Sequence, residues 1–149
     1  MEVIFTKTDS GCNTQCTRPD GTVVEWESPN NGKVPHDIVH WIIESKLELH
    51  DSFYGNIALG QDDYSVNELA HSNSELAKTE KLVLLIEADM AIRDGKLHAD
   101  PSAMRGLYGL KYPHSCSEET VSELIGLIDG AASDWNSRVA GEQLHRSFL

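Results

Sequence analysis

The strongest hydrophobic pattern in the chain lies at residues 34–49. Apolar side chains recur there at helical spacing over one broad arc, at Ile38, Val39, Trp41, Ile42, Ile43 and Leu49. Proline fixes φ near the helical value and lacks only an N–H that the first turn leaves unpaired, so Pro35 is predicted to be the first helical position. We therefore predict an amphipathic helix whose apolar face is buried and whose other face is polar.

Two further long helices are predicted downstream. One spans about 74–94, where Gly95 would end it in a left-handed conformation, and its apolar positions are Leu76, Leu82, Val83, Ile86 and Met90. The other begins after a Ser117 cap and two acidic residues and ends near Gly141. Residues 65–68 and 72–75 have the capping-box pattern. Glycines and two adjacent aromatics at 51–60 indicate a tight turn with a short apolar helix or loop that packs inward.

Strands are predicted near both ends of the chain. Alternating or β-branched residues at 2–8 and 22–28 predict an antiparallel hairpin, with room for a short strand near 14–18 and turn signals at 9–11 and 19–21. Residues 142–149 fit a helical tail or a strand, and an inward Leu144 and Phe148 favour a strand that pairs with the hairpin. The predicted fold class is α+β: residues 1–149 form one domain in which the hairpin packs on about three helices.

Composition limits the partners. Twelve basic against twenty-four acidic residues give a formal net charge of −12, which disfavours binding to nucleic acid and to an anionic membrane surface. No apolar run approaches the roughly 18 residues of a membrane span, and the N-terminus has no basic leader or signal-length apolar core. Three cysteines, an odd number, favour reduced thiols. We expect a cytoplasmic protein whose partner is a protein or a small molecule.

Two segments carry a family resemblance. Residues 35–44, PHDIVHWIIE, and 51–60, DSFYGNIALG, resemble a group of small bacterial proteins of unknown function. That group has a PxHDxxH(aromatic)xxE helix followed by a GF(aromatic)G turn, and it closes with a G-E-x-L segment, here residues 141–144. Ser52 stands where the group usually has glycine. The resemblance implies a bacterial, cytoplasmic protein with a closing strand, and it implies no activity.

The polar face of the first helix suggests a metal site. His36 and His40 are spaced i, i+4, so their imidazoles can meet at one point, as in the zinc-binding H-E-x-x-H helix. Asp37 would take the general-base position, and Glu44 or Glu68 could be the third ligand. In this hypothesis the chain is a hydrolase that depends on zinc or another divalent metal.

The same residues have a second interpretation. His36, His40 and Glu44 could form a hydrogen-bonded network that fixes how the helix meets segment 51–60. Glu68 is also explained as the capping partner of Ser65. We therefore favour a non-enzymatic domain that binds a ligand or a protein in a pocket beside this ridge. Its predicted lining residues are Trp41, Phe53 and Tyr54.

The cysteines allow a further, separate zinc site. Cys12 and Cys16 are predicted to lie in the hairpin loop, and His114 and Cys116 lie in another loop. These four residues are of zinc-ligating type, but their spacing does not match that of a zinc ribbon. Their position in loops can equally be a matter of chance.

Overall fold

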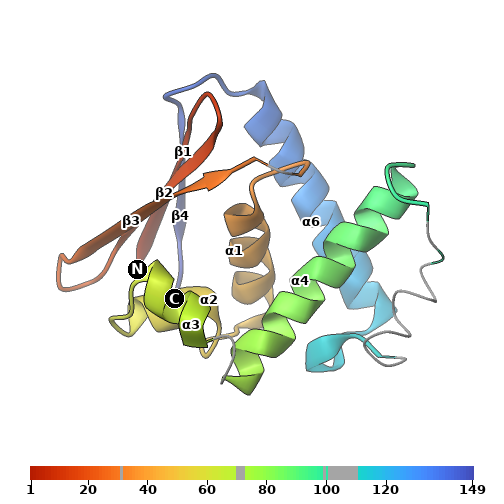
Figure 1. The fold of residues 1–149 in the computed structure, drawn as a ribbon, viewed down its shortest axis with the longest axis horizontal. Coiled ribbons are helices and arrows are strands. Elements are labelled where there is room, and N and C mark those ends of the chain that lie inside the picture. Colours follow the sequence, from red (N-terminus) through yellow and green to blue (C-terminus); the bar gives the residue numbers. More distant parts are fainter. Residues whose placement is uncertain (31, 70–72, 99, 101–110) are drawn as a thin grey trace.

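The computed structural model describes residues 1–30, 32–69, 73–98, 100 and 111–149. Its elements, in chain order, are β1 (Glu2–Lys7), β2 (Gly11–Thr17), β3 (Val23–Pro29), α1 (His36–Leu47), α2 (Phe53–Ala58), α3 (Asp63–Leu69), α4 (Ser74–Arg93), the 3-10 turn η1 (Pro113–Ser115), α6 (Glu118–Ser137) and β4 (Gln143–Ser147) (Figure 1). The α+β fold class predicted from the sequence is confirmed. Among the described residues, no helix is long and apolar enough to cross a membrane.

The four strands form one antiparallel sheet in the order β3-β2-β1-β4. The predicted C-terminal strand is confirmed, because β4 pairs with β1 and places Leu144 opposite Phe5. The predicted pairing of residues 2–8 with 22–28 is wrong, because β2 lies between these two strands. Each of the two turn signals reverses the chain once, so the segment between them is the seven-residue strand β2 rather than a short strand near 14–18.

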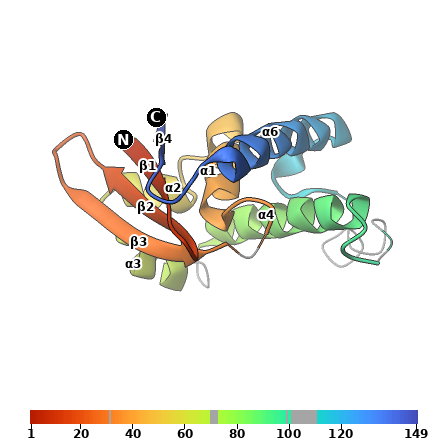
Figure 2. The same cartoon turned by 90° about the horizontal axis from the view of Figure 1, so that it is seen from above.

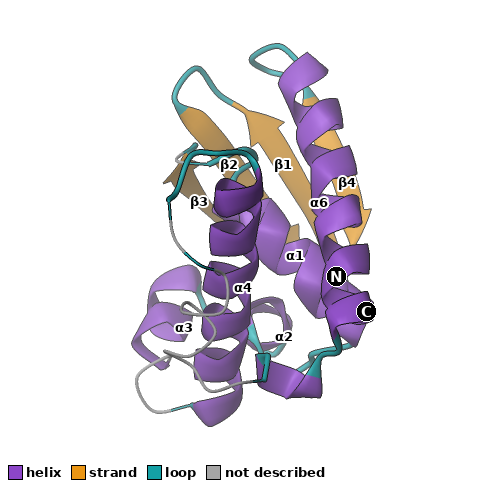
Figure 3. Ribbon diagram, turned by 90° about the vertical axis from the view of Figure 1, so that its right-hand side faces the viewer, coloured by secondary structure: helices purple, strands orange, loops and turns teal. Residues whose placement is uncertain are grey.

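Helix α1 is the centre of the molecule. The helices cover one face of the sheet, and α1 lies between the sheet and the two long helices α4 and α6 (Figures 1 and 2). Viewed from the side of α4 and α6, these two helices stand in front of α1 with the sheet behind (Figure 3). Both Ile38 and Ile43 of α1 are fully buried in the core that the sheet and helices share. Polar side chains on the buried faces of α1 therefore lie close to the sheet or to another helix.

The ends of α1 differ slightly from the prediction. Pro35 is the residue before the helix, with an extended ψ of 136°, and its carbonyl accepts the first helical hydrogen bonds from Ile38 and Val39. His36 is therefore the first helical residue. The helix ends at Leu47 because Glu48 adopts a left-handed conformation with φ of 54°. The helix is thus shorter at both ends than predicted, by one residue at the start, expected at Pro35, and by about two at the end, expected near Leu49.

Two short helices follow α1. Segment 51–60 contains the inward-packed helix α2, as the sequence allowed, and Gly55 is required there because a Cβ would lie 1.8 Å from the His50 carbonyl oxygen. In α3, Ser65 lies inside the helix and its N–H donates to Asp62 Oδ1, so the predicted cap at Ser65 is wrong. With these two, the part of the chain that is described holds five α-helices rather than about three.

The long helices begin as predicted. Asn73 caps α4 by accepting from two backbone N–H groups; Ser72, the predicted cap, lies outside the described residues. Gly95 follows α4 with φ of +72°, as expected. Ser117 caps α6 and accepts from Thr120 N–H, which confirms that start. The end is wrong, because α6 stops at Ser137 and Gly141 belongs to the turn before β4.

Candidate metal centre

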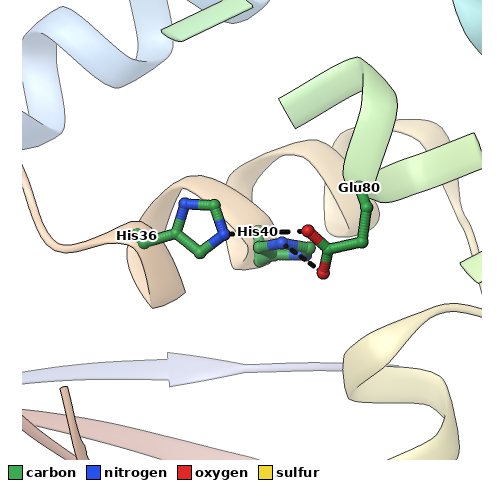
Figure 4. A group of neighbouring side chains, drawn as sticks. All are labelled: His36, His40 and Glu80. Atoms are coloured by element: carbon green, nitrogen blue, oxygen red, sulfur yellow. Dashed lines mark ion pairs between the residues drawn. The ribbon is translucent and has the colours of Figure 1, made fainter. Parts of the chain in front are cut away.

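Two imidazoles of α1 meet one carboxylate of α4. His40 Nε2 lies 3.2 Å from Glu80 Oε1, and His36 Nε2 lies 3.9 Å from Glu80 Oε2. The two rings meet edge to face with centroids 4.7 Å apart. Figure 4 shows the Glu80 side chain reaching from α4 to both histidines on α1. The meeting follows from the i, i+4 spacing on α1 and from the crossing of α4 over this face.

Each imidazole is held from its other nitrogen by a second carboxylate. His40 Nδ1 lies 3.0 Å from Glu44 Oε1, and His36 Nδ1 lies 3.2 Å from both oxygens of Glu87. A carboxylate only accepts hydrogen bonds, so both Nδ1 atoms donate. Glu44 is fully buried, and its other oxygen accepts from Tyr54 N–H at 2.8 Å. These carboxylates orient both rings so that both Nε2 atoms point at Glu80.

The carboxylates change the protonation of the histidines. Contacts with Glu80 and Glu87 raise the pKa of His36 from 6.5 to about 9. Burial lowers the pKa of His40, but hydrogen bonds to Glu44 and Glu80 outweigh it and raise this pKa to about 10. Burial also raises the pKa of Glu80, yet the two imidazoles hold it well below its ordinary value. Without a metal, both imidazoles are therefore charged at neutral pH and Glu80 is ionised.

The three donors suit a divalent metal. Ligand atoms that bind one zinc ion at about 2.0–2.2 Å lie about 3 to 4 Å apart. One ligand atom from each of His36, His40 and Glu80 lies within 4.8 Å of the other two, so small side-chain rotations would close the remaining gap. The side chains of His36 and Glu80 are 43% and 31% exposed, whereas that of His40 is 4% exposed. The group could therefore take up a metal ion from its open side.

The other predicted ligands lie elsewhere. Glu44 is on the far side of the His40 ring from Glu80, where it holds Nδ1 rather than joining the group. Glu68 lies on α3 and is not a member of the group.

Sequence reasoning missed Glu80 and Glu87, although a signal for both exists. They alternate with Leu76, Val83 and Met90 at spacings of four and three, so two acidic residues interrupt one apolar ridge of α4.

Asp37 lies on the sheet side of α1. Its Oδ2 accepts three hydrogen bonds, from Thr14 Oγ1 at 2.9 Å, Trp26 Nε1 at 3.0 Å and Ser28 Oγ at 2.7 Å. The donors come from β2 and β3, so this carboxylate joins the first turn of α1 to two strands. Asp37, which was predicted to be a general base, therefore lies beside the sheet and is hydrogen-bonded to it.

The three predicted pocket residues lie in two different places. Phe53 and Tyr54 are buried in the core, and Tyr54 Oη donates to the Asp37 carbonyl. Trp41 lines a cavity of about 500 Å³ between α1, α6 and β4, where the Arg146 guanidinium lies 5.4 Å from the indole centroid. The cavity beside the histidines is another one, of about 740 Å³, and His36 and Asp37 border it.

The cysteines do not form a common zinc site. Cys12 and Cys16 lie on strand β2 and are buried, so their predicted place in a hairpin loop is wrong. Their Cα atoms are four strand steps, or about 13 Å, apart, far more than two ligands of one metal allow. Burial raises the pKa of each thiol to about 12. His114 instead contacts Thr79, with Nε2 2.9 Å from Oγ1.

Comparisons with protein-family models, with curated proteins and with solved structures find no match. What this chain does must therefore be inferred from its own side chains.

Proposed function

We propose that this chain binds one divalent metal ion through His36 Nε2, His40 Nε2 and a carboxylate oxygen of Glu80. One observation carries the proposal: both histidines point Nε2 at the same carboxylate while each Nδ1 is held by a carboxylate of its own. Metal-bound histidines in proteins almost always donate their second ring N–H in this way, because it orients the ring and strengthens the nitrogen ligand. Glu44 and Glu87 would be these supporting residues.

The charges of the group support the exchange of protons for a metal. Glu44, Glu80 and Glu87 together carry three negative charges when ionised, and the two protonated imidazoles carry two positive charges. A divalent ion also carries two positive charges, and it requires neutral imidazole ligands. Metal binding would thus leave the net charge of the group unchanged while releasing two protons. No other side chain would need to change its charge.

The number of ligands bears on the kind of site. Structural zinc sites close the metal with four protein ligands, whereas catalytic sites use three and leave a position open for water or substrate. His36, His40 and Glu80 are three, and their donor set also suits iron(II). A metal in such a site supplies Lewis acidity and lowers the pKa of bound water, so hydrolysis is the activity we propose to test once metal binding is established.

A second candidate function is a metal-free clamp between α1 and α4. The observation in its favour is the 3.2 Å separation of His40 Nε2 and Glu80 Oε1, which is already that of an ion pair without any metal. In this reading the doubly protonated histidines serve only to hold the two helices together. The two candidates use the same residues, but they predict different metal contents.

Elemental analysis of the protein purified without a histidine tag tests the proposal. We expect near-stoichiometric zinc, iron or manganese, or uptake of one zinc ion in a calorimetric titration of the metal-free protein. His36→Ala, His40→Ala and Glu80→Gln should each abolish this binding. His145→Ala is the matched control, because His145 also pairs with a glutamate, Glu2, but on the exposed face of the sheet.

Two results would overturn the proposal. A protein that holds no metal and takes up no zinc would leave the clamp as the function of the group. Metal that stays bound in the His36→Ala and Glu80→Gln variants, or that His145→Ala removes, would place the metal elsewhere in the chain.

A further inference from the structure

A cavity lies beside the candidate metal centre. Its volume is about 740 Å³, and it is bounded by the loop after β3, the first turn of α1 and the second half of α4. Apolar side chains from three parts of the chain line it, and all three are buried: Val34, Met90 and Ile128. A cavity of this size, mainly apolar and with a few fixed polar groups, is typical of a site for a small organic molecule.

Asp37 is the fixed polar group of this cavity. Three donors hold its Oδ2, so the side chain has little freedom to rotate. Its other oxygen, Oδ1, makes no hydrogen bond to any residue that the structure describes, although Asp37 lines the cavity. A carboxylate held in this way offers one preorganised acceptor to a ligand, with little entropy left to lose on binding.

The charge of Asp37 also lacks a counterion. Its three partners are two hydroxyl groups and an indole, all neutral, and no ion pair joins it to another described residue. The other carboxylates of the cavity are matched: Glu87 by His36, and Asp94 by Lys33 at 3.2 Å. Lys33 also forms an ion pair with Asp129, so both of its ion pairs are with residues of the protein. The cavity therefore presents one half-buried carboxylate without an ion pair beside an apolar surface, whereas Lys96, which also lines the cavity and has no ion pair among the described residues, is exposed.

We infer that this cavity binds a small molecule that carries an ammonium group on an apolar body. The ammonium group donates to Asp37 Oδ1, and the apolar body lies against Val34, Met90 and Ile128. A charged hydrogen bond of this kind is stronger than a neutral one, particularly in a site that is partly shielded from water. The inference does not depend on the metal proposal, because none of these four residues is a proposed ligand.

Two probes that share a phenylethyl body and carry opposite charges test this inference. Saturation-transfer NMR and calorimetry would compare 2-phenylethylamine with 3-phenylpropionate, using protein treated with EDTA so that no metal contributes. We expect the amine to bind and the carboxylate to bind at least about tenfold more weakly, the factor expected for one charged hydrogen bond. Asp37→Asn keeps the shape of the side chain and should weaken binding of the amine by a similar factor.

Two variants in which an alanine is replaced by tryptophan test the cavity without changing Asp37. Ala91→Trp fills this cavity from α4 and should abolish binding, whereas Ala131→Trp fills the 500 Å³ cavity beside α6 and should leave binding unchanged. Both alanines are half-buried on long helices, so the two changes carry similar risks to folding.

Three results would overturn the inference: no binding of the amine, equal or tighter binding of the carboxylate, or loss of binding in Ala131→Trp but not in Ala91→Trp. Failure of the metal proposal would leave all three results unchanged, because the test is made without metal.

Discussion

Helix α1 carries two polar clusters in which carboxylates have different partners. On the sheet side, Asp37 is held by neutral donors from β2 and β3. On the α4 side, His36 and His40 alternate with the carboxyl groups of three glutamates. Hydroxyl and indole donors do not titrate near neutral pH, so the hydrogen bonds of the first cluster do not depend on the protonation of its donors. The second consists of groups that exchange protons, so a change of pH or a metal can replace its contacts.

The largest effect should come from removing Glu44, the fully buried member of the charged cluster. Glu44→Ala leaves the charge of buried His40 without its nearest partner and leaves Tyr54 N–H without an acceptor. Breaking a buried ion pair in this way costs about 3–5 kcal/mol of the free energy of unfolding. Urea denaturation of metal-free protein measures it. The exposed His145→Ala variant serves as the control, with an expected change within about 0.5 kcal/mol.

A loss below about 1 kcal/mol in Glu44→Ala would contradict this account. It would mean that His40 gives up its proton at little cost, and that the cluster is less charged than its contacts indicate.

A smaller effect is expected from breaking the neutral cluster. Asp37→Ala removes three hydrogen bonds and should lower the free energy of unfolding by about 2–4 kcal/mol. Because the partners are neutral, this loss should be the same with and without zinc, and the same at pH values on either side of neutrality. Chemical denaturation under these conditions measures it. Asp37→Asn keeps an acceptor oxygen and should lose less; a loss in Asp37→Ala that depends on zinc would contradict the separation of the two clusters.

Apart from these substitutions, the pH dependence of the metal-free protein tests the histidine cluster. The pKa values of His36 and His40 rise from 6.5 in the unfolded chain to about 9 and about 10 in the fold. The folded state thus binds more protons, so these groups stabilise it fully below about pH 6.5 and lose that contribution as the pH rises towards 9 and 10. The groups that face the two imidazoles are Glu44, Glu80 and Glu87.

Melting temperatures in EDTA should therefore fall as the pH rises above about 7. Saturating zinc should reverse the trend, because metal binding competes with protons and strengthens as they leave. The buried thiols of Cys12 and Cys16 also favour unfolding above about pH 9. The difference between the unchanged protein and His36→Asn isolates the contribution of His36. Equal slopes in the two proteins would show that the His36 imidazole is neutral in the fold.

Local patterns along the chain were sufficient for most of the elements. The apolar stripe of α1, the Ser117 cap of α6, the left-handed Gly95 after α4 and the closing strand β4 each depend on residues a few positions apart. Strand β2 was predicted only as a short strand near 14–18, because its sequence, GCNTQCT, has two β-branched threonines but no valine, isoleucine or aromatic residue. It is a strand because β1 and β3 pair with it on both sides. The bacterial family resemblance and the cytoplasmic location stay predictions.

In the candidate metal centre, too, the sequence predicts one part and the tertiary structure determines the other. The i, i+4 spacing on one helix places His36 and His40 on a common ridge, and the sequence shows this directly. The carboxylates that meet the ridge from α4 could not be identified from spacing, because 51 residues separate His36 from Glu87. They meet it because α4 turns the ridge of Leu76, Glu80, Val83, Glu87 and Met90 towards α1. Packing of apolar side chains between helices, which no short sequence window contains, brings these charges together.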